Sequence, residues 1–415
     1  MDADASVLGC LIRDLREVLG WSQGQLADKL CELGRATITR EYVSRWECGK
    51  RTPGPYWLRH LATVLDVPLQ VLEDCRMQRR NFITTVAATT IAPLVASELI
   101  HAGFAAALDG RPSVDEWETI LATYGRDYMS LGAEAIQRRL AGDLAVLQQQ
   151  LELPPLWAVA ARLMTVYGKT IPGADGAKAV KWYRMAAEAA DRSGDDRSRV
   201  WVRGRAAIAL GYEGSSLPVA EVFAKQALAI SDRPSLGRLN AIMAKAHVAA
   251  IRGDKRAALV LLDQGRRVFD VAGSHEQTSD YAVPEWRMAV FCSLLLARLG
   301  EERAALEAQD VALAQLWPKL NKIELHRNGG TCRDQVERRQ VHAPRIRSRL
   351  IGAIPDALPR FRTHIELHRG LMLVRAGDRV GGVEYARDAL AQLPAEKHSL
   401  TLRMLLTEIE GLPVD

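Results

Sequence analysis

A phrase that occurs three times in the second half of the chain constrains the fold most strongly. Each copy is an apolar stretch ending in a glycine and an acid, followed by a second stretch rich in small residues; the copies span 249–259, 296–306 and 373–383. Glycine turns of this kind join antiparallel helices, and small side chains at the crossings let the helices approach closely. The phrase therefore predicts stacked helical hairpins, an α-solenoid.

The composition favours helices throughout the chain. Alanine, leucine, arginine and glutamate are plentiful, while aromatic residues make up 6% of the sequence. Good helix formers dominate, and the aromatic and β-branched residues that favour strands are sparse. The length of 415 residues leaves room for a small domain beside a large one. We expect an all-α protein.

The first eighty residues carry helix start and stop signals at short intervals. Gly20 ends a first amphipathic helix, Ser22 and Gln25 form an S-x-x-Q capping box that begins a second helix, and Gly34 ends that one. The first helix is expected to bury one set of side chains and to turn another to water. The buried set is Leu8, Leu11, Ile12, Leu15 and Leu19, and the water-facing set is Arg13, Arg16 and Glu17.

A third, short helix is predicted from Thr39, its N-cap residue, to the Cys48-Gly49 pair. Val43 and Trp46 fall on its inner side. Two further amphipathic stretches, 56–65 and 68–72, complete a five-helix domain. The outward face of the third helix is predicted to consist of Arg40, Glu41, Ser44 and Arg45.

Two runs, W-S-Q-x-x-L-A at 21–27 and I-T-R-E-Y-V-S-R-W-E-x-G-K at 38–50, resemble the xenobiotic-response-element (Cro-like) helix-turn-helix family. The resemblance implies DNA binding, with the third helix in the major groove. Glu47 looks like the family's structural acid, which holds nearby arginines. The connection at 31–37 is longer than the family's usual tight turn. The resemblance implies phosphate contacts by Gln23, Lys50 and Arg51, and base contacts by Arg40, Glu41, Ser44 and Arg45.

Positive charge is concentrated where this DNA-binding face is expected. The whole chain carries only +5, but residues 34–59 contain six basic residues against two acids, a local charge of +4. Cationic side chains supply the phosphate contacts that dominate affinity for DNA, and arginine can also pair bidentately with guanine.

Domain boundaries follow from these patterns. We expect a helix-turn-helix DNA-binding domain at 1–76, a linker helix region at 77–112 and a helical-repeat domain at 113–415. The repeats, together with 183–190 and 220–229, resemble degenerate tetratricopeptide repeats. A helix-turn-helix domain, here called the head, joined to such repeats resembles the peptide-responsive quorum-sensing regulators.

That second resemblance implies a signalling peptide or small-molecule effector that shifts the geometry of a dimer on DNA. We expect a homodimer that binds a palindromic double-stranded DNA operator, because one small DNA-binding domain seldom supplies enough specificity alone. A cytoplasmic location is expected because the sequence does not begin with a secretory signal. The competing interpretation is a scaffold whose repeats sequester a protein partner while the head is vestigial. Candidate ligand contacts on the inner helices are Arg203, Asn240, Lys245 and Arg287.

Enzymatic function is not expected. The Gly-Lys-Thr sequence at 168–170 lacks the earlier glycine and the strand of a phosphate-binding loop. His364 and His368 could share a helix face, but no third metal ligand accompanies them. We therefore expect no catalytic residue, no metal and no cofactor.

The cysteines, one apolar segment and one arginine-rich segment are not expected to have a special function. The six cysteines form no C-x-x-C pair, which favours buried, reduced thiols; they are Cys10, Cys31, Cys48, Cys75, Cys292 and Cys332. The apolar segment at 78–108 follows a complete domain, so a linker helix is preferred to an export signal or a membrane anchor. The arginine-rich segment at 327–349 is interpreted as a solvated loop in preference to a second DNA contact.

Overall fold

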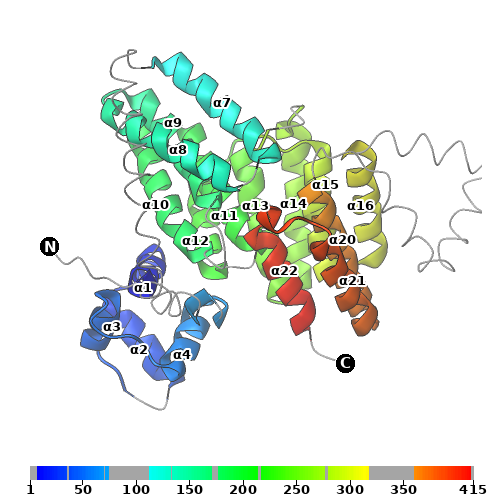
Figure 1. Cartoon of the computed structure of the whole chain (residues 1–415), viewed down its shortest axis with the longest axis horizontal. Coiled ribbons are helices and arrows are strands. Elements are labelled where there is room, and N and C mark those ends of the chain that lie inside the picture. The colour runs from blue at the N-terminus through cyan, green and yellow to red at the C-terminus, as the bar shows by residue number, and fades with distance from the viewer. Residues whose placement is uncertain are drawn as a thin grey trace, which may run out of the picture.

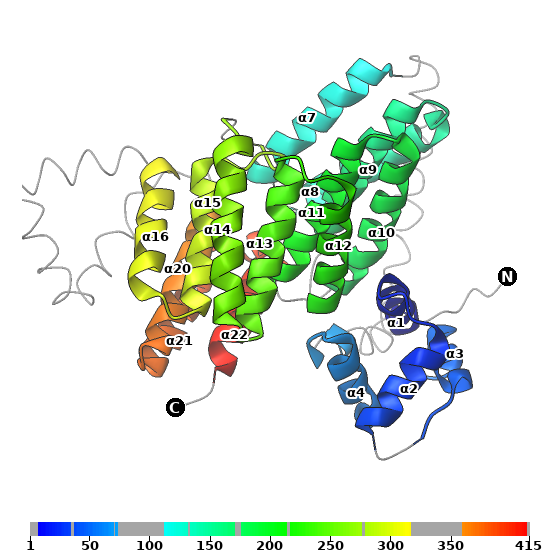
Figure 2. The ribbon, with the colours of Figure 1, turned by 180° about the vertical axis from the view of Figure 1, so that it is seen from behind.

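The computed structural model describes residues 7–34, 37–69, 71–73, 112–131, 133–170, 176–213, 216–275, 279–316 and 359–412. Every regular element in these ranges is helical, which confirms the all-α expectation. Figures 1 and 2 show a small N-terminal group of helices and a larger group stacked side by side.

The N-terminal group contains α1 (Val7–Val18), α2 (Gln23–Leu33), α3 (Arg40–Glu47) and α4 (Pro55–Leu65). Residue 69 and residues 71–73 are also helical, where the fifth helix was expected. The predicted apolar stripe of α1 is buried except for Leu19, which is half-buried. The core that α1 shares with the other helices includes Leu26, Leu30, Val43, Trp46, Leu58, Leu61 and Leu65.

The predicted helix starts are largely confirmed. The capping box is present: Gln25 N donates to Ser22 Oγ (3.2 Å) and Ser22 N donates to Gln25 Oε1 (2.7 Å). Thr39 is the N-cap of α3 with an extended backbone, but its side chain makes no capping bond. Its hydroxyl donates to the Glu41 carboxylate instead.

The larger group follows a gap in the described residues. In chain order it contains α7 (Val114–Ser130), α8 (Ala133–Leu147), the 3₁₀ turn η2 (Gln148–Gln150), α9 (Pro154–Lys169), α10 (Gly176–Ser193), α11 (Asp196–Glu213), α12 (Leu217–Ile230), α13 (Leu236–Ile251), α14 (Lys255–Ala272), α15 (Glu285–Arg298), α16 (Glu302–Leu316), α20 (Pro359–Arg375), α21 (Arg379–Ala391), η3 (Ala395–Lys397) and α22 (Leu400–Gly411).

The three predicted hairpins are present as α13–α14, α15–α16 and α20–α21. Their turn glycines, Gly253, Gly300 and Gly377, have φ values of +82°, +71° and +95°, a conformation that side chains with a Cβ rarely adopt. In two of the hairpins the following acid, Asp254 or Asp378, caps the next helix.

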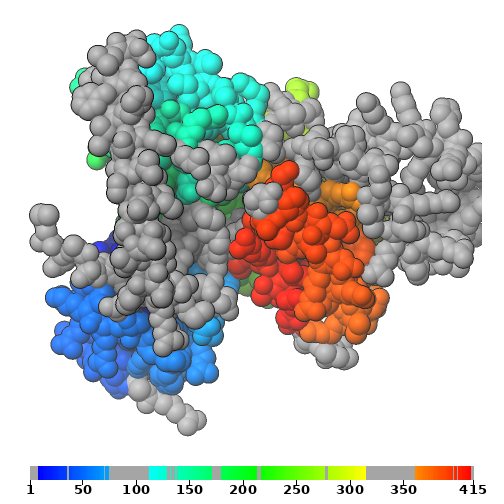
Figure 3. Space-filling model, in the orientation of Figure 1, coloured from blue at the N-terminus to red at the C-terminus, as the bar shows by residue number. Residues whose placement is uncertain are grey.

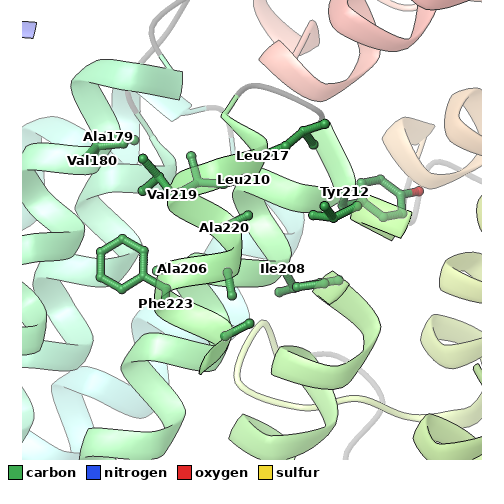
Figure 4. Packing of buried hydrophobic residues seen from close by; sticks show 14 of the residues in the cluster. Ala179, Val180, Ala206, Ile208, Leu210, Tyr212, Leu217, Val219, Ala220 and Phe223 are labelled. Carbon is green, nitrogen blue, oxygen red and sulfur yellow. The ribbon is translucent and has the colours of Figure 1, made fainter. Parts of the chain in front are cut away.

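The hairpins stack in two layers. One layer consists of α9, α11, α13, α15 and α20, which contact one another in that order, and each packs against its partner among α10, α12, α14, α16 and α21 (Figures 1 and 2). Small residues permit the close crossings: a Cβ on Gly204 of α11 would lie 2.0 Å from the carbonyl oxygen of Gly237 of α13. Figure 4 shows the side chains of α11 and α12, such as Ile208 and Phe223, filling the space between helices. The arrangement is that of a helical solenoid.

The two groups contact each other through α1, which packs against α10 and α12. Arg184 of α10 pairs with Asp14 (3.2 Å) and Glu17 (2.9 Å) of α1. A longer pair joins Arg252 to Asp66 at 3.6 Å. Figure 3 shows the blue surface of the N-terminal group at one corner of this face, apart from the orange and red surface of α20 to α22.

Several predictions lie outside the described residues: the linker helix at 77–112 except its last residue, the arginine-rich segment at 327–349, and Cys75 and Cys332. Within the described ranges, Cys10, Cys31, Cys48 and Cys292 are free thiols as expected, but only Cys292 is buried. In the same ranges no helix combines the length and the apolar character needed to cross a membrane.

Candidate nucleic-acid interface

Helix α3 has two distinct faces. Val43 and Trp46 are buried in the core of the N-terminal group, as predicted. The predicted outer face is turned to solvent: Arg40, Glu41 and Arg45 are exposed and Ser44 is half-buried. An amphipathic helix of eight residues therefore presents two arginines, a carboxylate and a hydroxyl on one accessible side.

Glu47, at the end of α3, is fully buried and holds the helix from behind. Arg16 of α1 forms a bidentate pair with it, with Nε 2.6 Å from one carboxylate oxygen and Nη2 2.9 Å from the other. This confirms that Glu47 binds nearby arginines. The prediction for Arg16 was wrong, since it was expected to face water but is only 7% exposed. Arg16 lies on the polar side of the helix wheel, yet its side chain is buried because it pairs with the buried carboxylate of Glu47.

The close approach of α1 to α3 depends on Gly9. A Cβ at this position would lie 2.3 Å from the carbonyl oxygen of Trp46 and 2.8 Å from that of Glu47. Such distances are shorter than any van der Waals contact, so a larger residue would push α3 outward. The glycine and the buried ion pair together fix the position of α3.

Gln23, predicted to contact a DNA phosphate, lies at the start of α2. Its amide Nε2 donates to Glu47 at 2.8 Å. In the free protein this bond ties the beginning of α2 to the end of α3, so the two helices of the motif share one carboxylate. The phosphate contact stays a prediction.

Lys50 and Arg51 follow α3 and are exposed. The chain turns back beneath the helix, because Arg51 N donates to the carbonyl oxygen of Arg45 at 3.1 Å. The Arg51 guanidinium lies 5.1 Å from the centroid of the Tyr42 ring, a cation–π contact that holds it beside α3. The two predicted phosphate contacts are thus next to the predicted base contacts.

Glu41 is the acid on this face. The hydroxyl of Thr39, which donates to its carboxylate, lowers the pKa of Glu41. At neutral pH the side chain is therefore an ionised acceptor, the form that could accept from a cytosine amino group.

The long connection between α2 and α3 is closed by Cys31. Its Sγ accepts from the backbone N of Ile38 (3.3 Å) and donates to the carbonyl oxygen of the same residue (3.4 Å). Ile38 itself is buried. Although the connection is longer than a tight turn, its end is fixed directly before α3.

These elements coincide with a known domain. Residues 7–74 match the model of a helix-turn-helix domain. No curated protein and no solved structure matches the chain. The helix-turn-helix domain supports a DNA-binding regulator, and α2 and α3 are the two helices of its motif.

The predicted ligand contacts of the repeats lie on three helices. Arg203 of α11 is buried and pairs with Asp191 at 2.6 Å. On α13, Asn240 is buried and Lys245 is half-buried. Arg287 of α15 is buried and pairs with Asp280 at 2.7 Å. Ligand binding by these residues stays a prediction.

Two buried clusters were not predicted from the sequence. In the first, Asp280 is surrounded by Lys169, Arg205 and Arg287. Burial opposes ionisation of Asp280, but these three cations hold its pKa well below the usual range.

The second cluster joins α20 to the rest of the solenoid. His368 lies 3.2 Å from the hydroxyl of Tyr212 and 2.9 Å from that of Ser293, and the ring of His364 stands beside it. His368 is buried and His364 is half-buried. Among the described residues, no group of three potential ligands is arranged to hold a metal ion.

Proposed function

We propose that the protein is a sequence-specific DNA-binding transcriptional regulator that places α3 in the major groove. The observation that supports the proposal is the division of α3: Arg40, Glu41 and Arg45 are exposed on one side, while Glu47 is clamped by Arg16 on the other. A reading helix must be both accessible and rigidly held, because misplaced donors lose their pairing with base edges. Ser44, Lys50 and Arg51 complete the proposed contact surface.

The finer parts of the proposal concern assembly and control. A helix of eight residues spans few base pairs, so we propose that two copies bind a palindromic operator with one head on each half-site. The repeats would supply the dimer contact and sense a peptide or small-molecule effector in the cytoplasm. Support for this part comes from the solenoid architecture, which is suited to binding other chains.

The decisive experiment is selection of bound sites from a pool of random duplex DNA, at two salt concentrations. The test variant is the double substitution Arg40→Ala and Arg45→Ala. The matched control is Arg256→Ala with Arg303→Ala, which removes the same charge from exposed positions on the repeats. The control separates lost contacts from lost net charge.

We expect the wild type and the control to recover one palindromic motif, with affinity that falls steeply as salt rises. Each bidentate arginine–guanine pair is worth about 1–3 kcal/mol, so the test variant, which removes two arginines, should lose about thirtyfold to about 25,000-fold in affinity. If no motif is enriched, or if the test variant recovers the same motif with the same affinity, the proposal fails. The sequestering scaffold would then be the interpretation to pursue.

A further inference from the structure

Three hydrogen-bond donors are buried without an acceptor where α9, α11 and the segment 279–284 meet. They are Arg162 Nε, Arg205 Nε and the hydroxyl of Tyr281. Trp201 contacts both Arg162 and Tyr281, and Arg205 donates to Asp280, the residue directly before Tyr281. Buried donors are nearly always paired, because an unmade hydrogen bond costs the full desolvation of the group.

The surroundings already contain more positive than negative charge. Asp280 is fully buried and accepts from Lys169 (2.6 Å), Arg205 (2.8 Å) and Arg287 (2.7 Å). One carboxylate thus faces three basic groups. Burial and the charge of Arg205 lower the pKa of Lys169 well below its usual range, but Arg205 and Arg287 alone already outnumber the carboxylate. Charges as deeply buried as these normally occur in balanced pairs, since an unpaired one carries a large desolvation cost.

Asp280 has little capacity left for the free donors. Its Oδ1 accepts from all three cations and its Oδ2 accepts from Lys169. Its backbone carbonyl oxygen is also used, since it accepts from Arg287 Nη1 at 3.1 Å. The carboxylate of Asp195, on which the charge of Arg162 acts, accepts from backbone amides at the start of α11.

An aromatic wall completes the junction. The ring of Trp201 lies 5.3 Å from that of Tyr281 and 5.9 Å from the guanidinium of Arg162. Arg205 is 7% exposed, whereas Arg162 and Tyr281 are half-buried. A water molecule could accept from the donors but would leave the charge excess in place.

We propose that this junction, formed by Arg162, Arg205, Tyr281 and Trp201, binds a small oxyanion, either free phosphate or a carboxylate group. Such an anion offers several acceptors at once and offsets the positive charge around Asp280. Guanidinium groups match the geometry of both anions. The site is separate from α3, so it goes beyond the proposed function and is tested without DNA.

The test is thermal unfolding and titration calorimetry of the full chain with inorganic phosphate, with acetate, and with chloride at matched ionic strength. Two variants remove single donors, Arg162→Met and Tyr281→Phe. The matched control is Arg192→Met, because Arg192 also stacks on a tryptophan, Trp157, at 4.9 Å but lies on α10. Tyr281→Phe deletes only a hydroxyl, so it reports on the site even if the arginine variant folds poorly.

We expect saturable stabilisation by phosphate or acetate but not by chloride. The anion that saturates at lower concentration identifies the source, a phosphate or a carboxylate. Loss of a hydrogen bond to a charged group should weaken binding by about tenfold or more in both site variants and leave Arg192→Met unchanged. A shift that grows without saturation for every salt, or equal binding by wild type and Tyr281→Phe, overturns the proposal.

Discussion

Replacing the buried carboxylate of Glu47 with an amide is the most direct perturbation of the helix-turn-helix domain. Glu47→Gln keeps the size of the side chain but leaves the buried guanidinium of Arg16 without its counter-charge. Breaking a buried ion pair from one side typically costs about 3–5 kcal/mol. Arg16 also donates to the carbonyl oxygen of Trp21 at 2.7 Å, a bond that survives, so we expect the lower end, about 3 kcal/mol. This is a large part of the stability of a small domain.

Hydrogen exchange of the intact chain, followed by mass spectrometry of its peptides, measures the effect locally. Amide protection in α1 to α3 should fall by about a hundredfold, the ratio that corresponds to about 3 kcal/mol. Peptides from α9 to α16 should be unchanged. The matched control is Glu41→Gln, on the exposed face of the same helix, which should have no effect. Protection in Glu47→Gln within threefold of wild type would show that the pair does not hold α3.

Three further predictions concern the repeats. Burial lowers the pKa of His364 from 6.5 to about 3, so the unfolded chain takes up a proton at a higher pH than the folded chain does. The free energy of unfolding should therefore fall as the pH drops below 6.5, by about 2 kcal/mol at pH 5. Chemical unfolding at several pH values would measure this loss, which should be smaller in His364→Asn. Gly204→Ala places a Cβ against the carbonyl oxygen of Gly237 and should lower the melting temperature, corresponding to about 1–3 kcal/mol; an unchanged value would disprove the close crossing. Arg184→Glu sets a third acid against the two acids of α1, and should increase the radius of gyration in small-angle scattering by releasing the head.

Local patterns in the sequence predicted the local structure well. The Ser22–Gln25 capping box, the inner and outer faces of α3 and the three glycine hairpins depend on residues within a few positions of one another. Helical periodicity and turn chemistry act at this range, so a single sequence contains the information. The fold class and the head were therefore accessible without a structure.

Contacts between distant residues account for what was missed. Arg16 looks like an ordinary surface residue of an amphipathic helix, and only Glu47, 31 positions away, explains its burial. The Asp280 cluster joins Lys169 and Arg205 across 111 and 75 positions, and no sequence motif connects its members. Side chains paired in this way carry no local signature, because the tertiary fold alone brings them together.

Ion pairs within the head are stronger than those between the head and the repeats. This difference determines what an effector could change. Within the head, Arg16 and Glu47 form a buried bidentate pair that makes α1 and α3 one rigid unit. Between the groups, Arg184 reaches Asp14 and Glu17 with partly exposed side chains, and such pairs contribute at most about 1 kcal/mol each. Under the proposed function, a conformational change in the repeats would therefore break the contact of α1 with α10 first. The head would rotate as a unit, altering the spacing of two heads on an operator while the shape of each α3 face stays the same.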